Sequence, residues 1–259
     1  MKWRMESKLS GFLVLVAVIP FWEFISRAEL VNPLFFPPMS KILQSFFLLV
    51  LSGDLPYQIL LSLKRAAAGY LLAALVFIPL GIAMGLYPWV YRLLEVVIEM
   101  ARPIPPPAII PVAMLFFGLG DEMKIFVIFF SCAWPILLNT YDGVRNIDRL
   151  LIDTARTFGL SRRRMIAGVI VPAASPQIMT GLRVSLAIML ILVVISEMVG
   201  STDGIGYFIL DAQRRFKVDH MYAGMLSLAI VGYALNQLFF LSYHRFLAWH
   251  KGLTGIGPT

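Results

Sequence analysis

Residues Ile147–Pro172 read IDRLLIDTARTFGLSRRRMIAGVIVP, which is the most polar long stretch between the apolar segments of this chain. Its first part has the periodicity of an amphipathic helix. Four apolar residues fall on one helical face, namely Ile147, Leu151, Ala155 and Phe158. On another face, Asp153 is spaced to pair with Arg149 or Arg156. Because Gly159 can adopt the left-handed conformation that ends a helix, the stretch predicts a helix, a glycine elbow and a second helix.

The second helix is expected to begin after Ser161, whose side chain can cap it, and to end at Pro172, which Pro176 follows. Three arginines, Arg162–Arg164, occupy its first turn, where positive charge opposes the helix dipole. Two compatible interpretations explain them. Cytoplasmic loops of membrane proteins are enriched in arginine, and arginine also binds anionic lipid or an acidic partner surface. Both interpretations place this loop in the cytoplasm.

The composition indicates a membrane protein with several spans. Of 259 residues, 59% are hydrophobic and only 14% are charged, and the mean hydropathy is +0.81. Soluble domains carry about 25% charged residues. The net charge of +7 follows membrane topology in this interpretation, and no soluble basic domain indicates a nucleic-acid partner. Cys132 lies in an apolar run and is interpreted as a small buried residue.

Six transmembrane helices are predicted from the uncharged runs, with both termini in the cytoplasm. A retained first span is expected because no signal-peptide cleavage pattern follows its basic N-terminus. The six predicted segments are 9–22, 66–91, 103–120, 125–141, 177–199 and 221–243. The run 42–53 is too short to span and is expected to form an interfacial helix on the outer side. The chain is predicted to be one transmembrane domain over 1–259, in which 1–60 hold the first span and the outer interfacial segment and 61–250 form the core.

Charge supports this orientation, because the predicted inner segments carry more basic residues than the outer ones. Two outer basic segments, Lys64-Arg65 and Arg214–Lys217, do not fit the bias.

Gly81 and Gly85 form a G-x-x-x-G pattern that permits close helix packing.

The third predicted segment is rich in proline between Pro103 and Pro111 and ends in a tight turn at Gly118–Asp121. Proline breaks regular helix, and backbone groups freed within a membrane need protein or water as partners. This segment is therefore expected to be buried in the bundle, after a connection that runs from Arg92 to Arg102.

The polar stretch resembles the cytoplasmic "EAA" loop of ATP-binding cassette (ABC) importer permeases. That pattern is Glu-Ala-Ala, three residues, Gly, nine residues and Ile-x-Leu-Pro. This chain has Asp153-Thr154-Ala155, Gly159 and Val169-x-Val171-Pro172 at the same spacing. The departures are Asp for Glu, Thr for the first Ala, and Val for Ile and Leu.

The resemblance implies an all-α, type I ABC importer permease fold in which the loop at 147–172 docks on a cytoplasmic ATPase and transmits its movement. The residues that it implies for coupling are Asp153, Thr154, Ala155, Gly159, Leu160, Ser161, Arg162 and Pro172.

Further motifs resemble the nitrate/taurine/alkanesulfonate/bicarbonate-type permeases of the same family. They are Phe35-Phe36-Pro37-Pro38, Ala101-Arg102-Pro103-Ile104-Pro105-Pro106, Phe117-Gly118-Leu119-Gly120-Asp121 and Thr180-Gly181-Leu182-Arg183. This resemblance implies a homodimeric permease in a bacterial inner membrane that receives a small, anionic solute from an extracytoplasmic solute-binding protein. It does not fix the solute, because members also carry other small organic compounds.

The sequence contains no phosphate-binding loop of the G-x-x-x-x-G-K-[ST] type, so ATP and Mg²⁺ are expected on a separate subunit. His220, His244 and His250 are dispersed and lack metal-ligand spacing. The glycines between positions 200 and 206 follow no strand, which argues against a dinucleotide site. With no converging catalytic groups, the chain is not expected to be an enzyme.

Arg183 and Glu197 lie within a predicted span, where charge is costly. They are separated by about 21 Å along a helix, so each is expected to need its own partner. Arg183 could attract an anionic solute and Glu197 could form part of an outer gate, or each could extend to the nearer membrane interface. Asn139 and Gln177 are further candidates for the pathway, although polar contacts between helices are the commoner role.

The alternative function is a secondary transporter or channel that works alone. Such proteins have inverted repeats and ionisable residues near the bilayer midplane. No internal repeat is visible in this sequence, and few charges lie within its spans.

Overall fold

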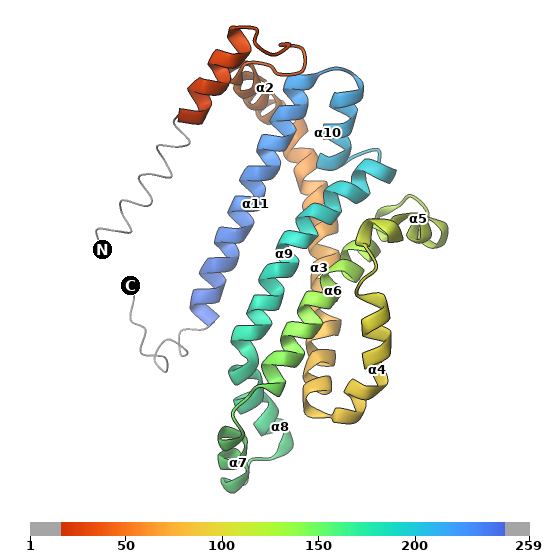
Figure 1. Cartoon of the computed structure of the whole chain (residues 1–259), viewed down its shortest axis with the longest axis vertical. Helices are drawn as coiled ribbons and strands as arrows, with labels where there is room; N and C mark the ends of the chain where they lie inside the picture. Colours follow the sequence, from red (N-terminus) through yellow and green to blue (C-terminus); the bar gives the residue numbers. More distant parts are fainter. Residues whose placement is uncertain (1–16, 247–259) are drawn as a thin grey trace, which may run out of the picture.

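The computed structural model describes residues 17–246, and that part of the chain is helical without strands (Figure 1). The all-α prediction is confirmed. A helical stretch over residues 17–27 is followed by α2 (Met39–Leu51), α3 (Asp54–Leu86), α4 (Pro88–Ala101), α5 (Pro106–Phe117), α6 (Asp121–Arg145), α7 (Arg149–Thr157), α8 (Arg162–Met165), the π-helical turn η1 (Ile166–Ile170), α9 (Val171–Gly200), α10 (Ile205–Arg214) and α11 (Val218–Phe246).

Four helices in the described part are long and apolar enough to cross a membrane. They are α3, α6, α9 and α11, and they correspond to the predicted second, fourth, fifth and sixth spans. The chain is therefore a multi-pass membrane protein. Most of the predicted first span (9–22) lies outside the described residues, so that span stays a prediction.

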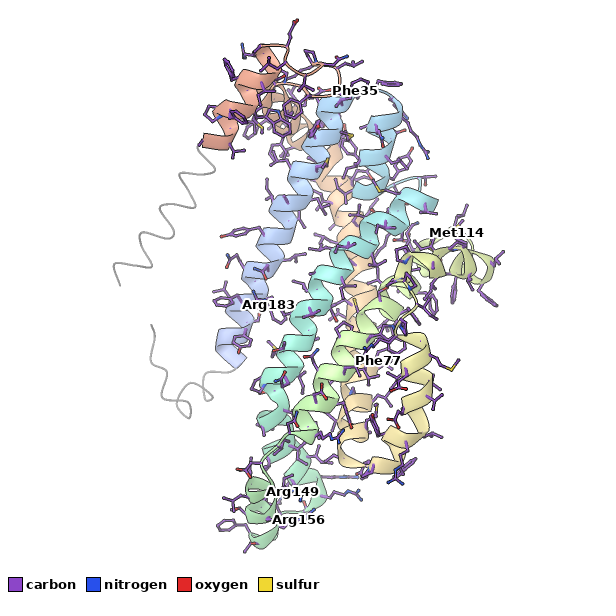
Figure 2. The ribbon with its side chains drawn as sticks, viewed as in Figure 1. Phe35, Phe77, Met114, Arg149, Arg156 and Arg183 are labelled. Carbon is purple, nitrogen blue, oxygen red and sulfur yellow. The ribbon has the colours of Figure 1, made fainter. Side chains whose placement is uncertain are left out.

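The third predicted segment differs from the expectation. The connection from Arg92 to Arg102 lies almost entirely in α4, and α4 meets α5 at a bend of 98°. Prolines break the chain between the two helices because they cannot donate a backbone hydrogen bond. The prediction that this segment is buried in the bundle is wrong for the chain by itself. Helix α5 buries Ile110 and Ala113 but leaves Leu115 86% exposed, and it projects from the edge of the bundle near Met114 (Figure 2).

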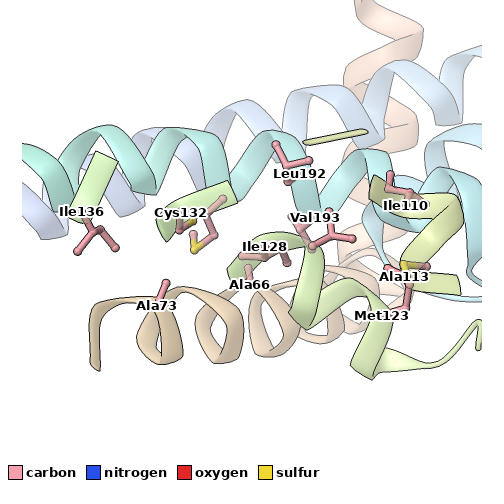
Figure 3. Packing of buried hydrophobic residues seen from close by; sticks show 12 residues of the cluster. Ala66, Ala73, Ile110, Ala113, Met123, Ile128, Cys132, Ile136, Leu192 and Val193 are labelled. Atoms are coloured by element: carbon pink, nitrogen blue, oxygen red, sulfur yellow. The ribbon is translucent and has the colours of Figure 1, made fainter. Parts of the chain in front are cut away.

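Helices α3, α6 and α9 form the centre of the molecule (Figure 3). Small residues of α3 let the backbones of α3 and α6 approach closely. A Cβ atom at Gly81 would lie 2.7 Å from the Cβ atom of Thr140, and one at Gly85 would lie 2.6 Å from the Cβ atom of Val144. The predicted close packing at these glycines is confirmed. Cys132 is fully buried among apolar side chains of this core, as expected.

The two ends of the bundle carry different elements (Figure 1). One end carries α7 and α8 and is called the α7 end. The opposite end carries α2, α10 and the turn between α10 and α11, and is called the α10 end. The helix predicted over 42–53 is observed as α2, which begins three residues earlier than predicted and packs against α11 and α3.

Candidate coupling loop and buried ion network

Helix α7 extends from the end of the bundle and has little cover. Its N-terminus is capped by Asp148, whose carboxylate accepts a hydrogen bond of 2.9 Å from the backbone N–H of Leu150. Of the predicted apolar face, Ala155 is buried, whereas Phe158 is 81% exposed. Arg149 and Arg156 point outward at the same end (Figure 2). Leu150 is also 71% exposed, so α7 presents two large apolar side chains to solvent beside charged residues.

The glycine elbow is confirmed. Gly159 has φ +68°, and its N–H donates to the carbonyl of Arg156 at 2.9 Å. The N–H of Leu160 donates to the carbonyl of Ala155 at 3.2 Å, which completes the turn that commonly ends helices with a left-handed residue. Nothing lies within 4 Å of a Cβ atom built on Gly159. Glycine is therefore favoured by its backbone conformation rather than by lack of space.

The chain after the elbow differs from the prediction in two respects. Ser161 occupies the N-cap position, but its side chain makes no capping hydrogen bond. The helix also does not end at Pro172, because α8, η1 and α9 run on without interruption through Pro172 and Pro176. The π-helical turn just before Pro172 changes the hydrogen-bond register where proline lacks an N–H, so the helix continues instead of breaking.

Arg162 connects the loop to the bundle. Its guanidinium lies 4.8 Å from the centre of the Tyr87 ring, and Tyr87 joins α3 to α4. The two side chains line a hollow of about 290 Å³ together with Arg156 and Met165. A shift of α8 would therefore act directly on the junction between α3 and α4.

The structure places the predicted coupling residues on one continuous loop. Ala155 is buried and Pro172 is half-buried at the start of α9. The exposed members are Asp153, Thr154, Gly159, Leu160, Ser161 and Arg162. In the described part of the chain, Asp153 pairs with Arg156 at 3.4 Å and not with Arg149.

The four predicted pathway residues are not gathered into one site. Arg183 is exposed on α9 and lines a hollow of about 570 Å³ together with Phe239, Phe240 and Tyr243 of α11 (Figure 2). Gln177 is exposed six residues earlier on α9. The amide of Asn139 donates to the carbonyl of Pro135 in its own helix at 2.8 Å.

Glu197 belongs to a buried ion network where α3, α6 and α9 meet the loop before α10. Its centre is Arg65, which is 5% exposed. The guanidinium donates from Nη1 to Glu197 at 2.9 Å and from Nε to Asp121 at 2.6 Å, and its Nη2 pairs with Asp203. Lys124 is 3.7 Å from Asp121 and is also buried. One arginine therefore joins α3 to α6, to α9 and to the loop before α10.

The Glu197 carboxylate is fully buried and its hydrogen bonds are satisfied on several sides. It accepts 2.8 Å hydrogen bonds from the hydroxyl of Ser62 and a 2.9 Å hydrogen bond from the N–H of Gly206. Ser62 in turn accepts from the N–H of Ile205 at 2.8 Å. A Cβ atom at Gly204, which has φ +98°, would overlap the carboxylate. This position needs glycine because the backbone approaches the carboxylate closely.

The burial of Glu197 excludes one of the two roles considered for this residue. Extension to the outer membrane interface is wrong, because the side chain has no exposed surface. The expectation of separate partners for Arg183 and Glu197 is confirmed for Glu197, which pairs with Arg65. The Arg65 guanidinium also holds the pKa of Asp203, in the loop outside the spans, below its ordinary value by hydrogen bonding to its carboxylate.

Sequence reasoning did not identify Arg65 as a functional residue. Its only signal was that Lys64-Arg65 did not fit the expected distribution of basic residues. The partners of Arg65 lie between 56 and 138 residues away along the chain. Such a constellation follows from helix packing and has no local sequence pattern.

The chain is similar to known transport proteins over most of its length. Residues 77–249 match the family described as "Binding-protein-dependent transport system inner membrane component". A putative ABC transporter permease protein of Methanocaldococcus jannaschii is 36% identical, over 95% of this chain and 93% of its own. A putative aliphatic sulfonates transport permease protein of Bacillus subtilis is 32% identical, over 95% and 90%. The taurine transport system permease protein of Escherichia coli is 30% identical, over 96% and 94%.

The fold is also similar to a solved transporter. An inward-facing structure of the MetNI methionine ABC transporter superposes with a TM-score of 0.58 at 18% sequence identity, covering 72% of this chain and 91% of that chain. At this identity the likeness concerns the fold alone. With the family match and the relatives above, the chain belongs to the binding-protein-dependent transport system inner membrane components and is a transmembrane permease subunit of an ABC importer.

Proposed function

We propose that this permease imports a small anionic solute of the sulfonate, taurine, nitrate or bicarbonate type. It works as a homodimer with two copies of a cytoplasmic ATPase and with an extracytoplasmic solute-binding protein. The relatives named for taurine and for aliphatic sulfonates support the solute class, because both solutes carry an anionic sulfonate group.

The observation that carries the coupling role is the uncovered helix α7. It is held on a glycine elbow at the end of the bundle and exposes Leu150 and Phe158. In the proposed mechanism α7 seats on the ATPase, which binds ATP and Mg²⁺ and changes between two arrangements. The unbroken helix through α8, η1 and α9 and the Arg162–Tyr87 contact carry this movement into the bundle.

The proposed orientation places the α7 end and both termini in the cytoplasm of a bacterium and the α10 end outside the inner membrane. The cluster Arg162–Arg164 at the α7 end supports this orientation, because basic residues are enriched on the cytoplasmic side.

In this orientation Arg183 lies nearer the cytoplasm, where it attracts the anionic solute from the hollow beside α11. Glu197 acts in the outer gate through its pair with Arg65. Asn139 and Gln177 provide polar contacts along the same helices.

Reconstitution tests this proposal. The purified permease is placed in liposomes alone, with the ATPase, and with the ATPase and the solute-binding protein, and uptake of labelled taurine or nitrate is measured with and without ATP. Uptake is expected only in the complete, ATP-supplied system. Full-rate transport by the permease alone would instead indicate a stand-alone transporter and would contradict the proposal.

A charge reversal tests the loop itself. The triple variant Arg162→Glu, Arg163→Glu, Arg164→Glu is expected to abolish uptake at normal membrane levels, because it removes the Arg162–Tyr87 contact and reverses the charge of the proposed docking surface. Arg92→Glu on α4 is the matched control for an exposed charge and is expected to retain uptake. Normal uptake by the triple variant would reject the coupling role.

A further inference from the structure

The turn between α10 and α11 is a basic and aromatic projection at the α10 end. Residues 213–217 read QRRFK, and all five are exposed. Arg215 pairs with Asp211 at 2.9 Å, whereas Arg214 and Lys217 form no ion pair in the part of the chain that the structure describes. Phe216 is 67% exposed between them. The surface therefore presents an aromatic ring surrounded by positive charge.

The backbone of this turn favours glycine, yet it carries phenylalanine. The N–H of Lys217 donates to the carbonyl of Ala212 at 2.9 Å, and the N–H of Phe216 donates to Gln213 at 3.1 Å. Phe216 has φ +55°, the left-handed conformation that glycine adopts with least strain. A bulky residue in this conformation, with its ring turned outward, contributes little to stability. Strain of this kind is retained where a residue serves a function.

Helix α10, which precedes the turn, is packed against the bundle. Helix α10 buries Ile205, Ile209 and Ala212 against the bundle. Its first turn is bound to the ion network, because the N–H of Gly206 donates to Glu197. Arg214 and Arg65 both line a hollow of about 500 Å³. A molecule bound to the turn would thus lie beside the ion network.

Positive charge on the outer side of a membrane protein runs against the usual distribution, so topology does not explain these residues. Arginine and aromatic residues are enriched in protein interfaces. We infer that Arg214, Arg215, Phe216 and Lys217 form a docking surface for an acidic face of the solute-binding protein, with Phe216 inserting into an apolar spot on that face. This inference rests on the proposed function, which places the α10 end outside and supplies the binding protein.

Binding measurements on the assembled importer test the inference. The permease–ATPase complex is placed in nanodiscs of zwitterionic phosphatidylcholine, and its affinity for the importer's solute-binding protein is measured at low and at high salt. The variant Arg214→Glu, Arg215→Glu, Lys217→Glu is expected to bind about tenfold more weakly or worse at low salt, and its affinity is expected to lose the decrease with salt seen in the wild type. Lys64→Glu, an exposed cation on α3, is the matched control and is expected to bind as the wild type does.

A second variant separates docking from stability. Phe216→Gly relieves the strained backbone, so its thermal midpoint is expected to equal or exceed that of the wild type while its affinity for the binding protein falls.

Wild-type affinity and salt dependence in the triple variant would overturn the inference. An equal loss of affinity in Lys64→Glu would overturn it as well. If the wild-type complex itself does not bind the solute-binding protein, the proposed function fails as well, so the two failures are distinguishable.

Discussion

Helices α7 and α10 end in the same backbone turn at opposite ends of the molecule, but with different residues in the left-handed position. At the α7 end this residue is Gly159, and three arginines follow within five positions. At the α10 end it is Phe216, with basic residues on both sides. The glycine turn is unstrained and redirects the chain, whereas the phenylalanine turn accepts strain and presents a side chain.

The ion pairs near the two turns differ in the same way. Asp153 and Arg156 beside the glycine turn are 66% and 68% exposed. Arg65 and Glu197, to which α10 is anchored, are 5% and 0% exposed. The ion pair at the α7 end therefore faces solvent, whereas the α10 end is anchored by a buried pair.

The largest effect is expected at the glycine elbow. Gly159→Pro should abolish uptake at normal membrane levels, because proline fixes φ at about −65° and lacks the N–H that bonds to Arg156. Gly159→Asn is the control, since asparagine tolerates the left-handed conformation, and it should retain most uptake. Wild-type uptake by Gly159→Pro would show that the geometry of the elbow is not needed.

The next effect concerns the support of the α10 end. Arg65→Ala leaves the Glu197 carboxylate buried without its cation and should destabilise the protein by about 3–5 kcal/mol. Thermal unfolding in detergent measures this change. The double variant Arg65→Ala, Glu197→Ala should recover part of the loss, because no unpaired charge stays buried at that position. Lys64→Ala, at the exposed neighbouring position, should have a small effect, and a loss as large as that of Arg65→Ala would contradict the proposed role of the buried pair.

A smaller change of opposite sign is expected at the phenylalanine turn. Phe216→Gly should stabilise the protein by about 1 kcal/mol, since glycine adopts a positive φ without the steric cost borne by other residues. The thermal midpoint in detergent checks this outcome. Gly159→Ala is the mirror experiment and should destabilise by a similar amount. A destabilised Phe216→Gly variant would mean that the ring packs against the protein rather than serving a partner.

The smallest effect on stability is expected at the exposed pair. Asp153→Ala and Arg156→Ala should each change the free energy of unfolding by less than about 1 kcal/mol, because water screens an ion pair that is two-thirds exposed. Uptake measured on the same variants sharpens the comparison. Reduced uptake with unchanged stability would assign Asp153 to coupling, whereas unchanged uptake would remove it from the coupling surface.

The sequence was sufficient for helix α7 and its glycine elbow because the information there is local. The apolar spacing in 147–158, the glycine at 159 and the two candidate partners of Asp153, of which Arg156 forms the pair, all lie within a few turns of one chain segment. The long apolar runs likewise determined which helices are long enough to span. Such features follow from backbone hydrogen bonding and from the side chains of near neighbours, which do not depend on the rest of the fold.

Only the tertiary structure decided the remaining features. Arg65 contacts Asp121, Glu197 and Asp203 because α3, α6 and α9 pack together. A buried charge is stabilised only if packing places opposite charges and hydrogen-bond partners beside it. The continuous passage through Pro172 depends on a π-helical turn, and the exposure of α5 depends on a bend of 98°. The partners of Arg65 lie 56 to 138 residues away, so no single stretch of this sequence contains the ion network.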